Sequence, residues 1–119
     1  MQRDLDDLAA EWKELIGKAR SGSLRPDEYN SGTIAITNLG MFGVSDFDAV
    51  LPVGMGTILA MGGTADAVVP DVNSVMGLRK TRQMKITATC DHRPIYGSDT
   101  AAFLKTLAKI MEDECDSVL

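Results

Sequence analysis

Cysteine, histidine and aromatic residues are scarce in this chain of 119 residues, which also lacks long apolar runs and an excess of basic residues. The two cysteines, Cys90 and Cys115, lack the spacing of a disulfide framework or a zinc site, which indicates a reducing compartment and no metal centre. No apolar run could span a bilayer and no stretch resembles a signal peptide, so any targeting segment would lie outside these residues. With 12 basic and 17 acidic residues, a surface that neutralises nucleic-acid phosphates is not indicated.

The residues that are present suffice for one domain with an apolar core, since 45% of them are hydrophobic. Apolar residues at helical spacing predict one amphipathic helix over residues 4–20 and a second after Gly97. β-prone runs lie between the helices, and one of them is apolar without alternation, as in a strand buried on both faces. The predicted strands are 33–37, 57–61 (the uniformly apolar run) and 84–90, with a connector at 21–32 and a hairpin or surface excursion at 68–78. This order of elements predicts an α/β fold.

The only histidine, His92, lies in the segment TCDHRPIYGSD, directly after a predicted strand and before a turn that Gly97 closes. An imidazole can take up and return a proton near neutral pH, and loops that follow strands often carry catalytic groups. A surface or structural histidine explains the pattern about equally well. Cys90 and His92 could also form a thiolate–imidazole pair, but Cys90 continues the apolar alternation of its strand and is better explained as a buried, unreactive thiol.

A second candidate lies at the end of the first predicted strand, in the segment TNLGMFG. The Thr37 hydroxyl and the Asn38 amide are donors at a strand end. They could stabilise a developing oxyanion, or the segment could simply form a turn.

Two further patterns have simpler explanations than ligand binding. The glycine-rich run GMGTILAMGG lacks the spacing of a phosphate-binding loop, so its glycines are assigned to turns and close packing. A basic cluster could bind a phosphate group, but a solvated surface explains it better. The cluster consists of Arg79, Lys80, Arg82 and Lys85.

Together these motifs resemble a known family. The resemblance is carried by TIAITNLGMFGVSDFDAVLPVGMGTILAMG and DHRPIYGSDTAAFLKTLAKIMED, which are similar to the catalytic domain of the dihydrolipoamide acyltransferases of 2-oxo acid dehydrogenase complexes. Within that family they look most like the pyruvate dehydrogenase branch of plastids and cyanobacteria. The resemblance implies a chloramphenicol acetyltransferase-like fold, a two-layer sandwich of a mixed β-sheet with helices. It covers residues 1–119 as the C-terminal half of the catalytic domain. We therefore expect the N-terminal half and the lipoyl and peripheral-subunit-binding domains to lie outside this sequence.

The resemblance also implies an activity, the transfer of an acetyl group from a dihydrolipoyl arm to coenzyme A. His92 matches the family's catalytic histidine, which deprotonates the coenzyme A thiol, and Thr37 matches the hydroxyl residue that donates to the oxyanion. Asn38 and Phe47 correspond, more weakly, to substrate-binding positions. The residues expected to hold the His92 loop are Asp91, Arg93, Tyr96 and Gly97.

Tyr96 departs from the family pattern, because most members carry aspartate or asparagine at this position. A phenol is neutral at pH 7 and cannot form the ion pair of an aspartate. We expect Tyr96 to fix the loop by packing beside Pro94 and Ile95 and by a contact of its hydroxyl.

The resemblance implies partners as well. A homotrimer, with His92 and Thr37 on opposite sides of a subunit boundary, would assemble into a large cubic or icosahedral core. Pyruvate dehydrogenase, dihydrolipoamide dehydrogenase and the covalent lipoyl group would join through domains outside this chain. The expected location is the chloroplast stroma, or alternatively a cyanobacterial or bacterial cytoplasm. Alternatives are a non-catalytic core subunit and a succinyl or branched-chain specificity. The presence of both His92 and Thr37 favours the enzyme.

Overall fold

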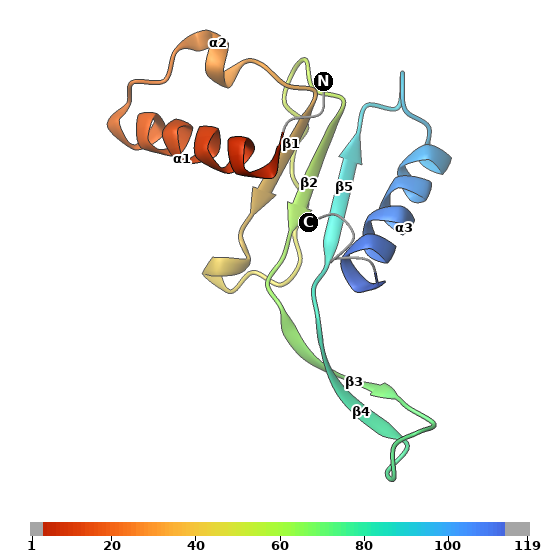
Figure 1. Ribbon diagram of the computed structural model, residues 1–119. Coiled ribbons are helices and arrows are strands. Elements are labelled where there is room, and N and C mark those ends of the chain that lie inside the picture. The colour runs from red at the N-terminus through yellow and green to blue at the C-terminus, as the bar shows by residue number, and fades with distance from the viewer. Residues whose placement is uncertain (1–3, 114–119) are drawn as a thin grey trace. The chain divides into compact units, whose positions relative to one another are not determined.

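The computed structural model describes residues 4–113, so Cys115 lies outside the described part of the chain. These residues form two compact units, one of residues 4–32 and 106–113 and the other of Thr33–Lys105. The helices are α1 (Leu5–Ser21), α2 (Pro26–Tyr29), the short 3-10 helix η1 (Gly40–Phe42) and α3 (Gly97–Asp113), and the strands are β1 (Ile34–Asn38), β2 (Thr57–Met61), β3 (Ala65–Pro70), β4 (Leu78–Gln83) and β5 (Ile86–Cys90) (Figure 1). The α/β composition agrees with the sequence-based prediction.

Helix α1 of the first unit begins and ends within one residue of the predicted range. Acidic side chains occupy its first turn and basic side chains its last, as the helix dipole favours. The helix ends at Gly22, whose φ of 67° lies in the left-handed region that glycine adopts most easily. The predicted helix is therefore confirmed.

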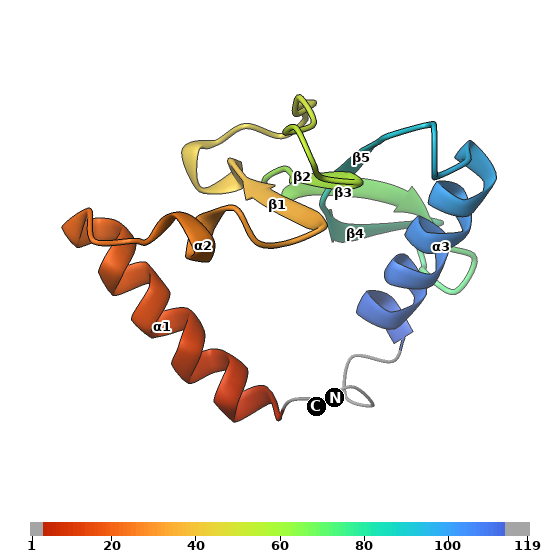
Figure 2. The same ribbon diagram turned by 90° about the horizontal axis from the view of Figure 1, so that it is seen from above.

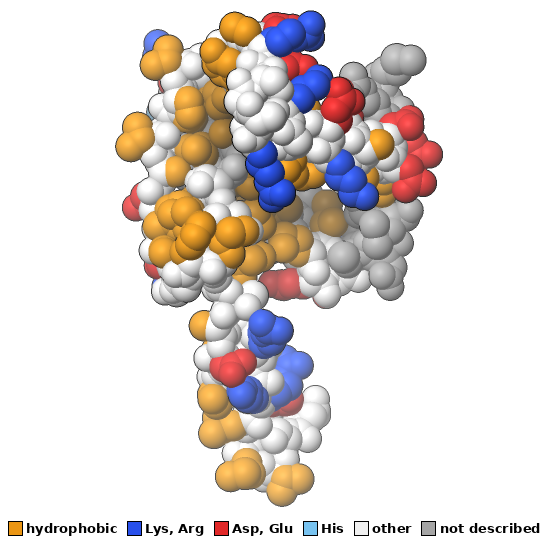
Figure 3. Space-filling view, turned by 90° about the vertical axis from the view of Figure 1, so that its left-hand side faces the viewer, with side chains coloured by type: hydrophobic (Ala, Val, Ile, Leu, Met, Phe, Trp, Pro, Cys, Tyr) orange, Lys and Arg blue, Asp and Glu red, His pale blue; other side chains and the backbone are white. Residues whose placement is uncertain are grey.

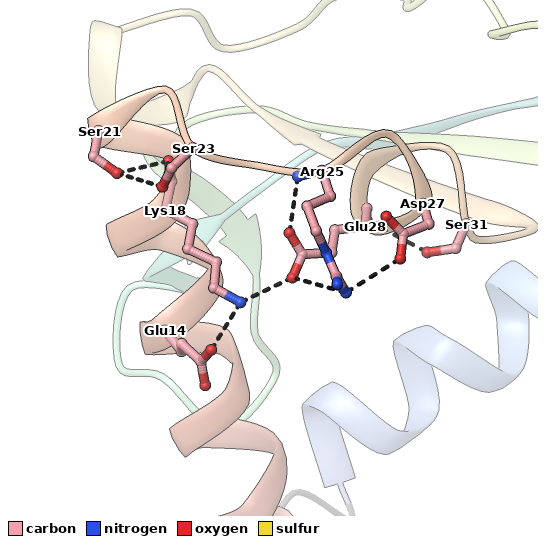
Figure 4. A network of polar contacts seen from close by, with 8 residues as sticks. All are labelled: Glu14, Lys18, Ser21, Ser23, Arg25, Asp27, Glu28 and Ser31. Atoms are coloured by element: carbon pink, nitrogen blue, oxygen red, sulfur yellow. Dashed lines mark hydrogen bonds and ion pairs between the residues drawn. The ribbon is translucent and has the colours of Figure 1, made fainter.

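The predicted connector after α1 was wrong in one part, because it contains the short helix α2. The Glu28 carboxylate accepts a hydrogen bond of 2.9 Å from the N–H of Arg25, which closes the start of α2. Lys18 Nζ lies 2.8 Å from carboxylate oxygens of both Glu14 and Glu28 and so links α2 to α1 (Figure 4). The Arg25 N–H, followed by the Lys18 ammonium group, lowers the pKa of Glu28.

The second unit is built on a three-stranded sheet in the order β1-β2-β5, and both ribbon views show these strands side by side (Figure 1, Figure 2). The β1–β2 pair is parallel and the β2–β5 pair is antiparallel, so the sheet is mixed. Thr57, Ile58, Leu59 and Ala60 of the central strand are each at most 8% exposed, and Gly62, just after this strand, is the one other buried residue among the described residues. The predicted strand buried on both faces is confirmed.

The hairpin of β3 and β4 follows the end of β2 and leads into the start of β5 (Figure 1). Of the two predicted possibilities, a hairpin and a surface excursion, the structure has the hairpin, but β3 begins three residues before the predicted segment and β4 lies where no strand was predicted. Figure 3 shows Lys and Arg side chains along the hairpin and hydrophobic side chains at its tip. The tip carries the exposed Val72, Val75 and Met76. β4 was missed because both faces of this two-stranded ribbon are largely exposed, so its sequence does not alternate.

Close packing of backbone explains the glycines after β2. A Cβ atom added to Gly40 would come within 2.7 Å of the Gly63 Cα atom, and one on Gly62 would collide with the Ser45 carbonyl oxygen. The segment after β1 therefore lies directly against the segment after β2. The assignment of these glycines to close packing is confirmed.

Many apolar side chains are exposed in both units. In α1, the predicted apolar face holds Leu5, Leu8 and Trp12, which are 46%, 43% and 65% exposed. In β1, Ile34 and Ile36 are 55% and 67% exposed. The predicted pattern is therefore present, but the described residues do not cover it.

Candidate active site

Hydrogen bonds hold the loop that carries His92 through the two residues adjacent to it, Asp91 and Arg93. The Asp91 N–H donates to the Gly56 carbonyl at 2.9 Å, and the Ile95 N–H closes the turn on the Asp91 carbonyl at 3.1 Å. Arg93 donates to the Asp91 carboxylate from its backbone N–H at 3.1 Å and from its guanidinium group at 2.6–3.1 Å. The residue before His92 is thus hydrogen-bonded to the residue after it. The prediction that Asp91 and Arg93 hold this loop agrees with these contacts.

The same contacts fix the charge of Asp91. Hydrogen bonds from the Arg93 side chain, and then from its backbone N–H, lower the pKa of Asp91 to about 2. In turn, the carboxylate raises the pKa of Arg93. Both groups are therefore charged throughout the neutral range, and the pair is present whenever His92 could act as a base.

His92 is exposed, and its ring meets the ring of Tyr96. The two centroids lie 5.9 Å apart at an interplanar angle of 83°, an edge-to-face arrangement. The predicted role of Tyr96 is corrected in two respects. Its side chain is 62% exposed rather than buried, and the structure records no hydrogen bond of its hydroxyl to residues 4–113. Because the ring lies at the surface of this unit, the hydroxyl faces solvent.

Cys90 is held by two hydroxyl groups that the sequence did not single out. Thr57 Oγ1 and Thr100 Oγ1 lie 3.3 Å and 3.2 Å from its sulfur. All three residues line a cavity of about 260 Å³, mostly apolar, together with Ile34, Ile95, Asp99 and Phe103. These contacts favour the interpretation of Cys90 as a structural thiol over a thiolate–imidazole pair.

Thr37 lies in β1, half-buried and paired with Ala60 of β2. The neighbouring Asn38 uses its side-chain oxygen to accept a 2.9 Å hydrogen bond from the Gly40 N–H. For Asn38 this favours the turn that the sequence left open, because the oxygen organises the start of η1. Phe47, the other weakly assigned position, is half-buried in the segment that connects η1 to β2.

The structure does not bring Thr37 and His92 together within one chain. Backbone hydrogen bonds join Asp91 to Gly56 and Gly56 to Thr33, so the His92 loop begins level with Thr33, four residues before Thr37. At ~3.3 Å per residue and ~4.8 Å per strand, the Cα atoms of Asp91 and Thr37 lie roughly 16 Å apart. Figure 1 shows the loop between β5 and α3 at the opposite end of the sheet from the end of β1.

The predicted basic cluster is paired with nearby polar groups. Arg79, Lys80 and Lys85 lie 3.6 Å, 2.9 Å and 2.8 Å from the carboxylates of Asp71, Asp66 and Asp46, respectively, and Arg82 donates to the Thr64 hydroxyl. These pairs support the interpretation as a solvated surface.

Residues 4–113 contain no group of three or more His, Cys, Asp or Glu side chains that could hold a metal ion. Among the same residues, every helix is too short or too polar to cross a membrane.

The family model for the 2-oxoacid dehydrogenases acyltransferase (catalytic domain) matches residues 1–119. The chain belongs to this family. Similar members include component 4 of the chloroplastic pyruvate dehydrogenase complex of Arabidopsis thaliana, a dihydrolipoyllysine-residue acetyltransferase, at 53% identity over 92% of this chain and 22% of that protein. The mitochondrial counterpart of Caenorhabditis elegans is 41% identical over 92% of this chain and 22% of that protein. The chain thus spans about a quarter or less of the length of these relatives.

Solved structures confirm the fold of this acyltransferase-family chain. It superposes on dihydrolipoamide acetyltransferase of Azotobacter vinelandii with a TM-score of 0.83 and 29% identity, covering 99% of this chain and 47% of that one. The study of that enzyme addresses the catalytic role of a serine, a histidine and an asparagine, and the asparagine follows the histidine by four residues. Tyr96 follows His92 by the same interval. The cubic core of a pyruvate dehydrogenase complex matches equally well, with a TM-score of 0.83.

Proposed function

We propose that this chain is part of an acyltransferase that moves an acetyl group from dihydrolipoamide to coenzyme A, with His92 as the general base. The observation that carries the proposal is the His92 loop, in which the Asp91–Arg93 pair fixes the backbone on both sides of an exposed imidazole. The reaction is also supported by similar proteins, up to 53% identical, that are dihydrolipoyllysine-residue acetyltransferase components.

The chemistry needs one base and one hydrogen-bond donor. The imidazole of His92 takes the proton of the coenzyme A thiol, and the sulfur forms a bond to the carbonyl carbon of the acetyl thioester. The resulting oxyanion accepts a hydrogen bond from the Thr37 hydroxyl. When the oxyanion collapses, the bond to the dihydrolipoyl sulfur breaks and that sulfur receives the proton. The lipoyl group is here a substrate, which we assign to a domain outside residues 1–119.

A complete site needs two copies of the chain. A base and an oxyanion donor must both contact one tetrahedral centre, each within hydrogen-bond distance of its atom. Because Thr37 and His92 lie at opposite ends of the sheet, we assign His92 to one copy and Thr37 to its neighbour. The cubic core of a similar protein supports such an assembly. We propose a homotrimer as its building block.

We assign residues 1–119 to the C-terminal half of the catalytic domain, in agreement with the 47% coverage of the solved chains. The location proposed is the plastid, because two similar proteins of Arabidopsis thaliana, 53% and 50% identical, are chloroplastic. Binding of pyruvate dehydrogenase and dihydrolipoamide dehydrogenase is assigned to other domains of the full-length protein.

The test is an assay of acetyl transfer from acetyl-dihydrolipoamide to coenzyme A by the assembled full-length protein. His92→Ala should lower turnover about 10²–10⁴-fold and leave assembly unchanged, as measured by size-exclusion chromatography. An assembled wild-type protein without transfer activity would favour the alternative of a non-catalytic core subunit. A His92→Ala variant with near-normal turnover would remove His92 from the mechanism.

A further inference from the structure

We propose that Tyr96 is a positioning residue that orients the His92 imidazole through its aromatic ring. It would do so at the position where the Azotobacter enzyme has an asparagine, four residues after its histidine. The proposal rests on the proposed function, because orienting His92 matters to the reaction only if His92 is its base.

The backbone of Tyr96 is held firmly at the start of α3. Its carbonyl accepts hydrogen bonds from the N–H groups of Asp99 at 3.0 Å and Thr100 at 3.1 Å, and its own N–H donates to the Asp99 carboxylate at 3.3 Å. The Thr100 hydroxyl lies 3.4 Å from the Tyr96 carbonyl and 3.2 Å from Cys90 Sγ, and it can donate to either. The residue is therefore connected both to α3 and to the end of β5.

The ring of Tyr96 is the part of the residue left to interact with His92. The Asp91–Arg93 pair fixes the backbone around His92, but its hydrogen bonds do not involve the imidazole and so do not set its orientation. The structure records no hydrogen bond of the imidazole to residues 4–113, whereas the Tyr96 ring lies edge-to-face with it at 5.9 Å. A base must point at its proton within narrow limits, so a contact that selects one imidazole orientation raises turnover.

An asparagine could orient a histidine through a hydrogen bond, but an aromatic ring must do so through its shape and its charge distribution. The hydroxyl of Tyr96 is not needed for this, since it has no recorded partner among the described residues. Phenylalanine at position 96 should therefore preserve the orientation of the imidazole, whereas a large aliphatic residue should not.

The experiment compares Tyr96→Leu and Tyr96→Phe in the assembled full-length protein, with Tyr29→Leu as a matched control. Tyr29 in α2 is 57% exposed, close to the 62% of Tyr96, and it belongs to a different compact unit from the His92 loop. Tyr96→Leu should lower kcat about tenfold, in the range of an aromatic pair interaction, with the KM for coenzyme A changed less than about twofold. Tyr96→Phe and Tyr29→Leu should both stay within about twofold of the wild type.

Three outcomes would overturn the proposal. Tyr96→Leu could retain wild-type kcat, it could raise KM alone, or Tyr96→Phe could be as impaired as Tyr96→Leu, which would assign the role to the hydroxyl. The proposed function fails differently, because an inactive wild-type protein, or an active His92→Ala variant, contradicts it whatever the Tyr96 variants do.

Discussion

Mixing two inactive variants should restore activity if the catalytic site forms between copies of this chain. The His92→Ala variant lacks the base and Thr37→Val lacks the donor, so neither assembles a complete site alone. In a mixed assembly, a site that takes His92 from a Thr37→Val copy and Thr37 from a His92→Ala copy contains both groups. The separation of roughly 16 Å between the Cα atoms of Asp91 and Thr37 predicts such mixed sites.

The amount of restored activity follows from random assembly. At a one-to-one ratio, a site receives an intact His92 in about half of the cases and an intact Thr37 in about half, independently, so about a quarter of the sites are complete. The expected activity per subunit is therefore about a quarter of the wild-type value. The assay is acetyl transfer to coenzyme A by co-expressed copies with different tags, purified in sequence so that every assembly contains both variants.

A second mixture provides the control. The double variant, His92→Ala with Thr37→Val, is co-assembled with the wild-type chain. If sites form between copies, about a quarter of them are complete, whereas about half are complete if each chain supplies its own site. Two single variants that stay as inactive in the mixture as alone, together with half activity in the control, would refute the placement of the site between copies.

Three further predictions concern the Thr37 donor, the Asp91–Arg93 pair and the exposed apolar side chains. Thr37→Val alone should lower kcat on the order of 10²-fold with little change in the KM for coenzyme A, since a lost oxyanion donor acts in the transition state; a change in KM alone would make Thr37 a binding residue. Because the pKa of Asp91 is lowered to about 2, its pair with Arg93 is fully present above the ordinary carboxyl pKa of 3.8 and is lost only as the pH falls through about 2. The wild-type kcat should therefore show no step from Asp91 between pH 5 and 8, and Asp91→Asn should reduce kcat by no more than about fivefold at any pH in that range, as rate profiles would show. Residues 1–119 expressed alone should aggregate, because large apolar side chains such as Trp12 and Ile36 are exposed, and a monomer that melts cooperatively in calorimetry would contradict this.

The sequence predicted those elements whose pattern reflects burial or helix-end chemistry. The uniformly apolar strand β2 and the helix α1 were found where expected, because both signals are local. The strand β4 was missed because a largely exposed ribbon has no buried face to impose alternation. The helix α2 was missed because it has four residues, although a proline at its start and Glu28 near its beginning are the usual signals.

The candidate site was predictable in its residue types and not in its arrangement. His92 and Thr37 were identified from their motifs, but the distance between them depends on strand register, which pairs Thr37 with Ala60 and Cys90 with Thr57. The ring contact between His92 and Tyr96 depends on side-chain torsions in a loop, and the sequence suggested a hydroxyl contact instead. Local patterns identify chemistry, whereas geometry comes from pairing between distant segments.

The small core and the proposed division of the site between two copies both imply that catalysis requires assembly. Within the described residues, only Thr57–Ala60 and Gly62 are buried, and the apolar faces of β1 and α1 remain uncovered. A catalytic group must be held within about 0.5 Å of its productive position, and so small a core provides too little packing to hold both ends of the sheet that precisely. Contact with other parts of the assembly would bury these faces and also supply the missing donor or base. The contacts that bring His92 and Thr37 together would thus also make the site rigid enough for catalysis. Polar substitutions on the apolar faces of β1 and α1 should therefore abolish assembly and catalysis together.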